Sequence, residues 1–89
     1  MNIVYCKVIK NENGRYQLID TNDNVFPLVE QLNSYIVKTA YKKHEAIRIP
    51  YTIDDDGKVM LKQDSTLLQR VSIDTYYDAI KTTLKKQNV

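Results

Sequence analysis

The fold expected from this sequence depends on one stretch, VFPLVEQLNSYIVKTAY, which spans residues 25–41. Its apolar residues recur at the three- and four-residue steps of an α-helix and predict one apolar stripe. The stripe consists of Val25, Leu28, Val29, Leu32, Ile36 and Ala40, with Tyr35 beside it. Asp23 or Asn24 can cap the first turn, and Pro27 suits an early helical position because its missing N–H is not needed there. The stretch therefore predicts an amphipathic helix that the rest of the chain covers.

Two stretches before this helix predict a β-hairpin. Residues 3–9 are rich in β-branched side chains, and residues 15–20 alternate apolar and polar side chains. Between them lies Asn13-Gly14, and Asn-Gly favours a type I′ turn because both central residues of that turn have positive φ. The polar run 20–24 is expected to be a loop that leads into the helix.

A second hairpin is predicted after the helix. Residues 46–53 form its first strand and residues 58–62 its second, and the polar residues 54–57 form the turn. Pro50 cannot donate a hydrogen bond to a neighbouring strand, so the first strand is expected at a sheet edge or at a bulge.

The stretch from residue 65 to residue 71 admits two interpretations. Ser65 can cap a short helical turn, which is the favoured interpretation, or residues 67–71 can form a fifth strand. Ser72 is then expected to cap a final helix. The apolar stripe of that helix consists of Ile73, Tyr76, Tyr77, Ile80 and Leu84. Tyr76 and Tyr77 are expected to pack in the core, and the alternative is that they anchor a partner.

The resulting element order is β-β-α-β-β-α, in which each half is a hairpin followed by an amphipathic helix. A helix laid on one face of a sheet buries the apolar surfaces of both. The predicted class is therefore α+β, with a largely antiparallel four-stranded sheet and two amphipathic helices on one face. A chain of 89 residues is long enough for one modest core, so residues 1–89 are expected to form a single domain.

Composition argues for a cytoplasmic protein without a membrane anchor. The chain is 43% hydrophobic and 27% charged, and no apolar run approaches the ~18 residues of a membrane span. The N-terminus lacks the charged start and long apolar block of a signal peptide. The single Cys6 cannot form an internal disulfide, which fits a reducing compartment, and it is expected to pack in a strand as a small hydrophobe.

No pattern of residues indicates catalysis, a cofactor or a metal. His44 is the only histidine and follows two lysines at a predicted helix end, where an imidazole favours the helix dipole. One histidine and one cysteine cannot make a His/Cys metal site. The turn 54–57 resembles part of a calcium loop, but Gln63 stands where the twelfth ligand should be a bidentate glutamate. The chain is therefore expected not to be an enzyme.

Lysines close both predicted helices and suggest a nucleic-acid-binding patch. If the helices lie side by side and parallel, their basic ends can neutralise phosphates and a tyrosine can stack on bases. The residues of this alternative are Lys42, Lys43, Lys85, Lys86 and Tyr41. A structural explanation stays open, because lysines late in a helix and Asp74 and Asp78 early in one also complement the helix dipole.

The leading functional hypothesis is a small non-enzymatic binding module that acts through a protein partner or forms a homodimer. It rests on the missing catalytic residues, the small size and a surface rich in tyrosine and lysine. The expected binding surface is the strand edge with Arg48 and Pro50, an outer sheet face that carries Val4, Val8 and Ile19 or the residues that alternate with them, or both.

Two resemblances accompany this hypothesis. The segment Arg15-Tyr16-Gln17-Leu18-Ile19-Asp20, followed by a helix with Ser34-Tyr35-Ile36, resembles the opening of some tyrosine recombinases. The chain departs from that family after Thr39, where strands replace further helices, and none of the catalytic Arg, His and Tyr positions can be assigned. Its Lys-, Asn-, Tyr- and Ile-heavy usage resembles small accessory proteins of phages and mobile elements.

Overall fold

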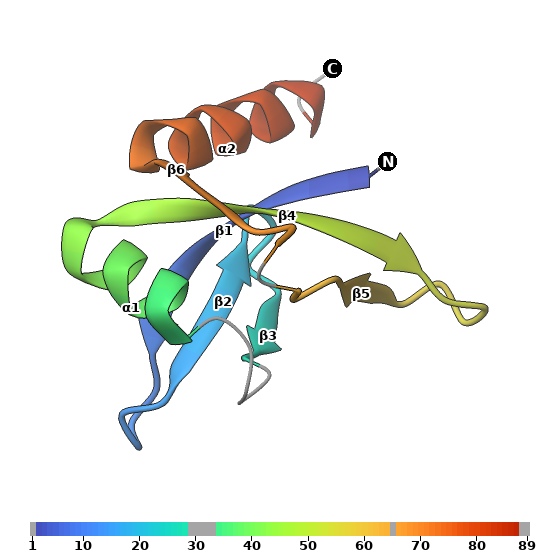
Figure 1. Cartoon of the computed structure of the whole chain (residues 1–89). Coiled ribbons are helices and arrows are strands. Elements are labelled where there is room, and N and C mark those ends of the chain that lie inside the picture. The colour runs from blue at the N-terminus through green and yellow to red at the C-terminus, as the bar shows by residue number, and fades with distance from the viewer. Residues whose placement is uncertain (1, 29–33, 65, 88–89) are drawn as a thin grey trace.

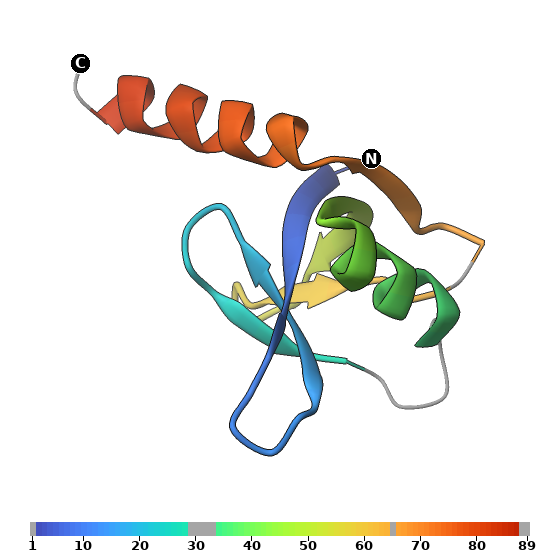
Figure 2. The ribbon, with the colours of Figure 1, turned by 90° about the vertical axis from the view of Figure 1, so that its left-hand side faces the viewer.

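The computed structural model describes residues 2–28, 34–64 and 66–87, which form a curled antiparallel sheet and two helices (Figure 1 and Figure 2). The elements in chain order are β1 (Asn2–Lys10), β2 (Tyr16–Asp20), β3 (Val25–Pro27), α1 (Ser34–Lys43), β4 (Glu45–Ile53), β5 (Val59–Leu61), β6 (Gln69–Ser72) and α2 (Ile73–Gln87). The strand order is β3-β2-β1-β4-β5, and β6 also pairs with β4. The predicted α+β class is confirmed, but the sheet has six strands and not four.

The first hairpin is confirmed, although its turn differs from the predicted type. β1 and β2 pair from Cys6↔Asp20 to Lys10↔Tyr16. Gly14 has φ +76°, whereas Asn13 does not have positive φ, so the turn is not type I′. The N–H of Gly14 instead donates to the Asn11 carbonyl over 2.9 Å, which makes a tight turn followed by a left-handed glycine.

The same five-residue loop occurs three times, at residues 11–15, 20–24 and 54–58. In each, the N–H of the first residue donates to the carbonyl of the fifth, and the N–H of the fourth donates back to the carbonyl of the first. The side-chain oxygen of the first residue accepts the N–H groups of the third and fifth. The fourth residue has positive φ in every case, as Gly14, Asp23 or Gly57. Each of these loops closes a hairpin.

The middle loop overturns the first part of the predicted helix. The Asn24 N–H donates to Asp20 Oδ1 over 2.9 Å, so Asn24 caps no helix, and the run 20–24 turns the chain back into β3. Val25 lies opposite Ile19 and Pro27 opposite Gln17 in the β2–β3 ladder. The helical spacing was wrong here because local loop hydrogen bonds and pairing with β2 outweigh it.

The rest of the predicted helix is confirmed as α1, which begins at Ser34. Val29 and Leu32 lie outside the described residues. Val37, which the predicted stripe omitted, is fully buried together with Ala40, whereas Tyr35 is 79% exposed. The buried face of α1 is therefore rotated from the predicted one, because the stripe was extrapolated from residues that lie in β3.

The two helices lie on opposite sides of the sheet, not on one face. α1 lies below β4 in Figure 1 and α2 above it. The main core lies on the α1 side and contains the buried residues Cys6, Val8, Leu18, Val37, Ala40, Ile47, Ile49 and Leu68. On the α2 side, Tyr76 is 4% exposed and Ala46 is fully buried. Successive side chains of a strand point to opposite faces of the sheet. Both faces of the central strands therefore carry apolar side chains, and one helix buries those on each face.

β4 is a central strand, which corrects the expectation for Pro50. It pairs with β1 along one edge, and its other edge pairs first with β6 over residues 45–48 and then with β5 over residues 51–53. The Pro50 carbonyl accepts the Lys62 N–H on that second edge, so the proline nitrogen faces the same edge. Pro50, which has no N–H to donate, thus lies between the part of β4 that pairs with β6 and the part that pairs with β5.

The stretch after residue 65 contains both a turn and a strand. The Leu67 N–H donates to the Asp64 carbonyl over 2.9 Å and closes a turn, whereas Val71, predicted to lie in the helical turn, belongs to the strand that was the alternative. The predicted cap Ser65 lies outside the described residues. β6 covers residues 69–72 and pairs with the beginning of β4, Glu45 lying opposite Ser72. Ser72 caps α2 as predicted, because its Oγ accepts the Asp74 N–H over 3.2 Å.

A substitution at Asp20 tests how much the loop 20–24, which the sequence did not predict as a hairpin turn, contributes to stability. The Asp20 carboxylate is buried and accepts the N–H groups of Asn22 and Asn24, and Oδ2 accepts Asn24 Nδ2. Asp54 holds the equivalent exposed loop with two N–H donors. We expect Asp20→Ala to lower the free energy of unfolding by about 2–3 kcal/mol and Asp54→Ala by about 1 kcal/mol in urea denaturation. Equal losses would show that burial adds nothing at Asp20.

Cys6 predicts a pH dependence of stability. Burial, with Asp20 nearby, raises the pKa of the Cys6 thiol from its ordinary 9.0 to about 12. Above pH 9 the unfolded chain releases this proton and the folded chain keeps it, so stability is full below pH 9 and falls as pH rises toward 12. The slope is at most about 1.4 kcal/mol per pH unit.

The matched control is Cys6→Ala, which lacks the thiol. Urea midpoints between pH 8 and about pH 10 should fall more steeply for the wild type than for the variant. The range stops there because tyrosines titrate above it. Identical slopes for the two proteins would contradict the assignment.

Candidate functional site

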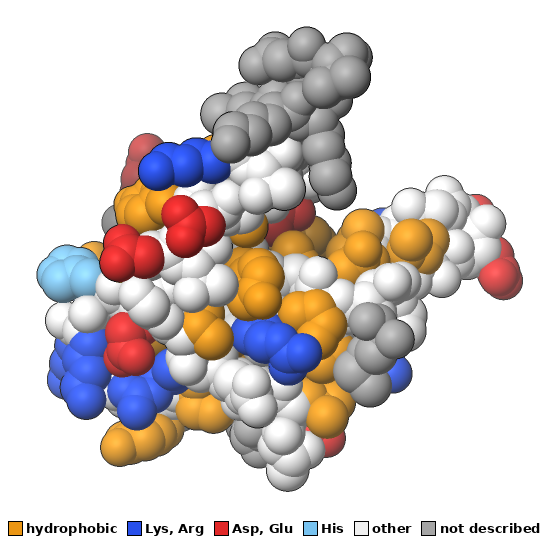
Figure 3. Space-filling model, turned by 90° about the horizontal axis from the view of Figure 1, so that it is seen from above, with side chains coloured by type: hydrophobic (Ala, Val, Ile, Leu, Met, Phe, Trp, Pro, Cys, Tyr) orange, Lys and Arg blue, Asp and Glu red, His pale blue; other side chains and the backbone are white. Residues whose placement is uncertain are grey.

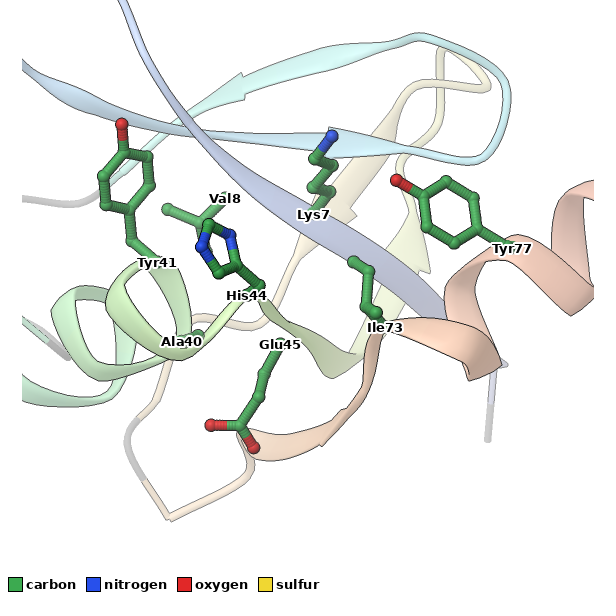
Figure 4. A pocket seen from close by; sticks show the side chains of 8 residues that line it. All are labelled: Lys7, Val8, Ala40, Tyr41, His44, Glu45, Ile73 and Tyr77. Atoms are coloured by element: carbon green, nitrogen blue, oxygen red, sulfur yellow. The ribbon is translucent and has the colours of Figure 1, made fainter.

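A pocket lies where the end of α1, the beginning of β4 and the beginning of α2 meet (Figure 4). We call it the notch. It has a volume of about 310 Å³ and is lined by Lys7, Val8, Ala40, Tyr41, His44, Glu45, Ile73 and Tyr77. Four elements and the α1–β4 connection therefore contribute to one hollow.

The notch exists because β1 extends beyond the last residue that pairs with β4. The last β1–β4 pair is Lys7↔Ala46, whereas β1 continues with β2 as far as Lys10. His44, with φ +54°, turns the chain from α1 into β4 at this point. Ile73 follows directly on β6, which ends opposite the first residue of β4. Side chains from both faces of β1 consequently reach the notch.

The floor of the notch is apolar and its rim is polar. Val8 and Ala40 are buried and Ile73 is half-buried. Tyr41 and Tyr77 are 37% and 44% exposed. In Figure 4 the hydroxyl end of Tyr77 points toward the Lys7 side chain, and Tyr41 lies on the opposite side of the hollow. The arrangement suits a ligand with one flat apolar part and one charged part.

The charges in the notch are unequal. Glu45 Oε1 accepts Arg70 Nη1 over 3.1 Å, so its negative charge already has a partner. Within residues 2–28, 34–64 and 66–87, Lys7 has no carboxylate at ion-pair distance. The ammonium of Lys7 is therefore the charge available to a ligand.

Beside the notch, the Tyr41 ring contacts two residues of the β1–β2 hairpin, Lys10 and Tyr16. The Lys10 ammonium lies 5.0 Å from the Tyr16 ring centroid and 5.1 Å from that of Tyr41. The two rings meet edge to face with their centroids 5.5 Å apart. These contacts hold the Tyr41 ring in place at the notch.

Two of the segments that line the notch are basic, whereas the beginning of α2, which also lines it, carries Asp74 and Asp78. Residues 7–16 and 34–45 carry six basic and two acidic side chains, a net +4 against +2 for the whole chain. We call these two segments the basic end, and their basic residues are Lys7, Lys10, Arg15, Lys38, Lys42 and Lys43. Figure 3 shows the histidine at the edge of the molecule with both basic and acidic side chains near it. The acidic turn 54–57 lies at the opposite end, beyond β4 and β5 (Figure 1).

The predicted lysine patch is not assembled. Lys42 and Lys43 are exposed in the last turn of α1, and Tyr41 lines the notch. α2, however, begins at the notch and runs away from it for 15 residues, on the order of 20 Å. Lys85 and Lys86 therefore lie at the far end of α2, and their side chains are outside the described residues. The helices are not parallel neighbours, so their basic ends do not meet.

The residues predicted for partner binding do not share a surface. Val8 is buried in the core and Val4 packs against it, so the expectation that they lie on an uncovered face is wrong. Ile19 lies opposite Lys7 and so on the other face. Pro50 is buried in the central strand, next but one to the half-buried Arg48.

Sequence reasoning did not select Lys7, Lys10 and Tyr16, and it favoured core packing for Tyr77 over a role as a partner anchor. The Lys10–Tyr16 pair could have been found, because the two residues flank the Asn-Gly turn and are opposite in the ladder. Tyr77 was assigned to the core because it follows the helical stripe, and only Tyr76 proves to be buried. Lys7 could not have been found, since its position depends on where β4 begins.

The structure offers no constellation for a metal or for acid–base catalysis in the part of the chain that it describes. No group of three or more His, Cys, Asp or Glu side chains comes together among residues 2–28, 34–64 and 66–87. The notch joins His44 to one carboxylate, that of Glu45. In the turn 54–57, Asp54 Oδ1 is occupied by backbone N–H donors. No helix among the described residues is long and apolar enough to cross a membrane.

Comparison with protein-family models, with curated proteins and with solved structures finds no match to this chain.

Proposed function

We propose that this chain is a small non-enzymatic binding module whose ligand is single-stranded nucleic acid, held at the basic end. The observation that carries the proposal is that two of the segments that line an open notch with tyrosines at its rim, residues 7–16 and 34–45, carry six basic and two acidic side chains. The proposal adopts the nucleic-acid alternative but moves its surface from the two helix ends to β1, β2 and α1.

The physical argument has two parts. Exposed lysines on adjacent elements neutralise phosphates and release counterions. Tyrosine rings accept bases of any sequence, because every base has a π-face, and bases can reach a ring only when they are unpaired. Tyr41 and Tyr77 are the rings exposed at the notch. A flexible single strand fits this combination better than a duplex, whose bases are stacked inside.

The connectivity gives a second, weaker support. A five-strand order β3-β2-β1-β4-β5 with a helix between β3 and β4 is also the order of the OB-fold, a partly open barrel that binds oligonucleotides on its β2–β3 face and its β1–β2 and β4–β5 loops. Of these, the β1–β2 loop belongs to the basic end, whereas the β4–β5 loop is the acidic turn 54–57. Gln63 Nε2 donates to the Pro27 carbonyl over 3.0 Å and so bridges the two ends of this order. Connectivity is an analogy and does not fix function.

The test is fluorescence anisotropy with labelled single-stranded (dA)₁₅ and the matched duplex at several salt concentrations. We expect the single strand to bind more tightly and its affinity to fall steeply with salt. Lys42→Gln/Lys43→Gln should lower the slope of log K against log salt by about 1.4, at ~0.7 per phosphate contact. The control is Lys58→Gln/Lys62→Gln at the acidic end, which should bind like the wild type. Undetectable binding at low salt, or equal loss in the control, would contradict the proposal.

A second candidate is self-association or protein binding through the β4–β5 hairpin, as the accessory-protein hypothesis requires. Ile53 is 55% exposed and Met60 47% exposed, and β5 ends the strand order. An exposed edge strand with apolar side chains can pair with another chain.

Sedimentation equilibrium tests this candidate. A dimer through β5 should give twice the 10.4 kDa chain mass at high concentration, and Ile53→Thr/Met60→Thr should return it to the monomer mass. Val25→Thr, at the other edge strand, is the matched control. A monomer mass for the wild type at all concentrations rules out the dimer.

A further inference from the structure

We infer that the notch holds one nucleotide, with its base against Tyr77 and its phosphate at Lys7. The inference deepens the proposed function and rests on it where the nucleotide is part of a strand. The same chemistry, a flat ring that carries an anionic group, also occurs in a free mononucleotide, and the experiment separates the two sources.

The size of the notch limits the ligand. Its volume of about 310 Å³ lies at the lower end of the ~300–1,000 Å³ of small-molecule sites. Space of this size is enough for one base with its sugar. The apolar floor of Val8, Ala40 and Ile73 suits the edge of a ring and leaves the phosphate at the rim.

Tyr77 is the ring that remains available for a base. One contact of Tyr41 is already made by the Lys10 ammonium and another by Tyr16. Among the residues that the structure describes, Tyr77 makes one ring contact, edge to face with Tyr76, with the ring centroids 5.5 Å apart and an interplanar angle of 75°. Because Tyr76 is buried and its hydroxyl donates to the Asp20 carbonyl over 3.0 Å, Tyr77 rests on a fixed support. Its 44% exposure leaves surface for stacking.

Lys7 is the charge that selects an anion. It extends from β1 between the two tyrosines that bound the notch (Figure 4). The Glu45 carboxylate at the notch is held by Arg70 at 3.1 Å and so does not neutralise Lys7. His44, at the turn between α1 and β4, adds a second nitrogen donor to the same rim.

The experiment is a ¹H–¹⁵N NMR titration with three probes: adenosine 5′-monophosphate, adenosine and ribose 5-phosphate. We expect the nucleotide to bind more tightly than either fragment and to shift the amides of residues that line the notch. Shifts confined to exposed lysines elsewhere, or equal affinity for the nucleotide and ribose 5-phosphate, would overturn the inference.

Substitutions test separately whether Tyr77 stacks on the base and whether Lys7 binds the phosphate. Tyr77→Leu should weaken nucleotide binding about tenfold, in line with the loss of one base–ring stack, whereas Tyr77→Phe should keep it within about twofold. Lys7→Gln should weaken binding of the nucleotide and leave that of adenosine unchanged. Tyr35→Leu, which removes a 79% exposed ring outside the notch, is the matched control. Loss of binding in Tyr77→Phe or in the control contradicts the assignment.

A parallel titration with (dA)₁₅ separates this inference from the proposed function. If the strand binds the wild type and the Tyr77→Leu and Lys7→Gln variants equally, the inference fails and the proposed function stands. If the nucleotide binds at the notch and the strand does not bind at all, the inference holds for a free nucleotide and the proposed function fails. If both bind and both weaken in the two variants, the notch is the nucleotide subsite of the strand-binding surface.

Discussion

The structure depends on how Asp20 holds the two sides of the sheet together. Its carboxylate shapes the loop that turns β2 into β3, and its carbonyl accepts the Tyr76 hydroxyl of α2 over 3.0 Å. The residue is 5% exposed, and the hydrogen bond from Tyr76 is buried, where leaving it unmade is costly, whereas the loop hydrogen bonds of the carboxylate are partly buried. One residue thus fixes a hairpin within the sheet and docks a helix 56 positions later.

The docking of α2 on the side of the sheet opposite α1 has a functional consequence. Each helix covers its own face of the central strands, and the end of one meets the beginning of the other where β4 starts. β1 continues past that point, so Lys7 and Val8 both reach the hollow that remains. Had the helices lain side by side, the same lysines and tyrosines would have formed no notch.

The candidate site could be predicted only in part. Tyr41 and the lysines at the end of α1 were found because helix ends can be read from local patterns. Tyr77 was assigned to the core because a helical stripe shows which residues share a face, and not how far the neighbouring element covers that face. Lys7 was missed because a strand register sets its neighbours, and register is a relation between distant segments.

Local chemistry in the sequence determined the α+β class, the two predicted hairpins, the body of α1 and the Ser72 cap of α2, because turns, caps and strand alternation act over a few residues. Only the tertiary structure decided that residues 25–27 join the sheet, that Pro50 lies in a central strand, and that the helices take opposite faces. Each of these depends on which surface is left to cover once distant strands have paired. That competition for burial is a property of the assembled sheet and of no segment alone.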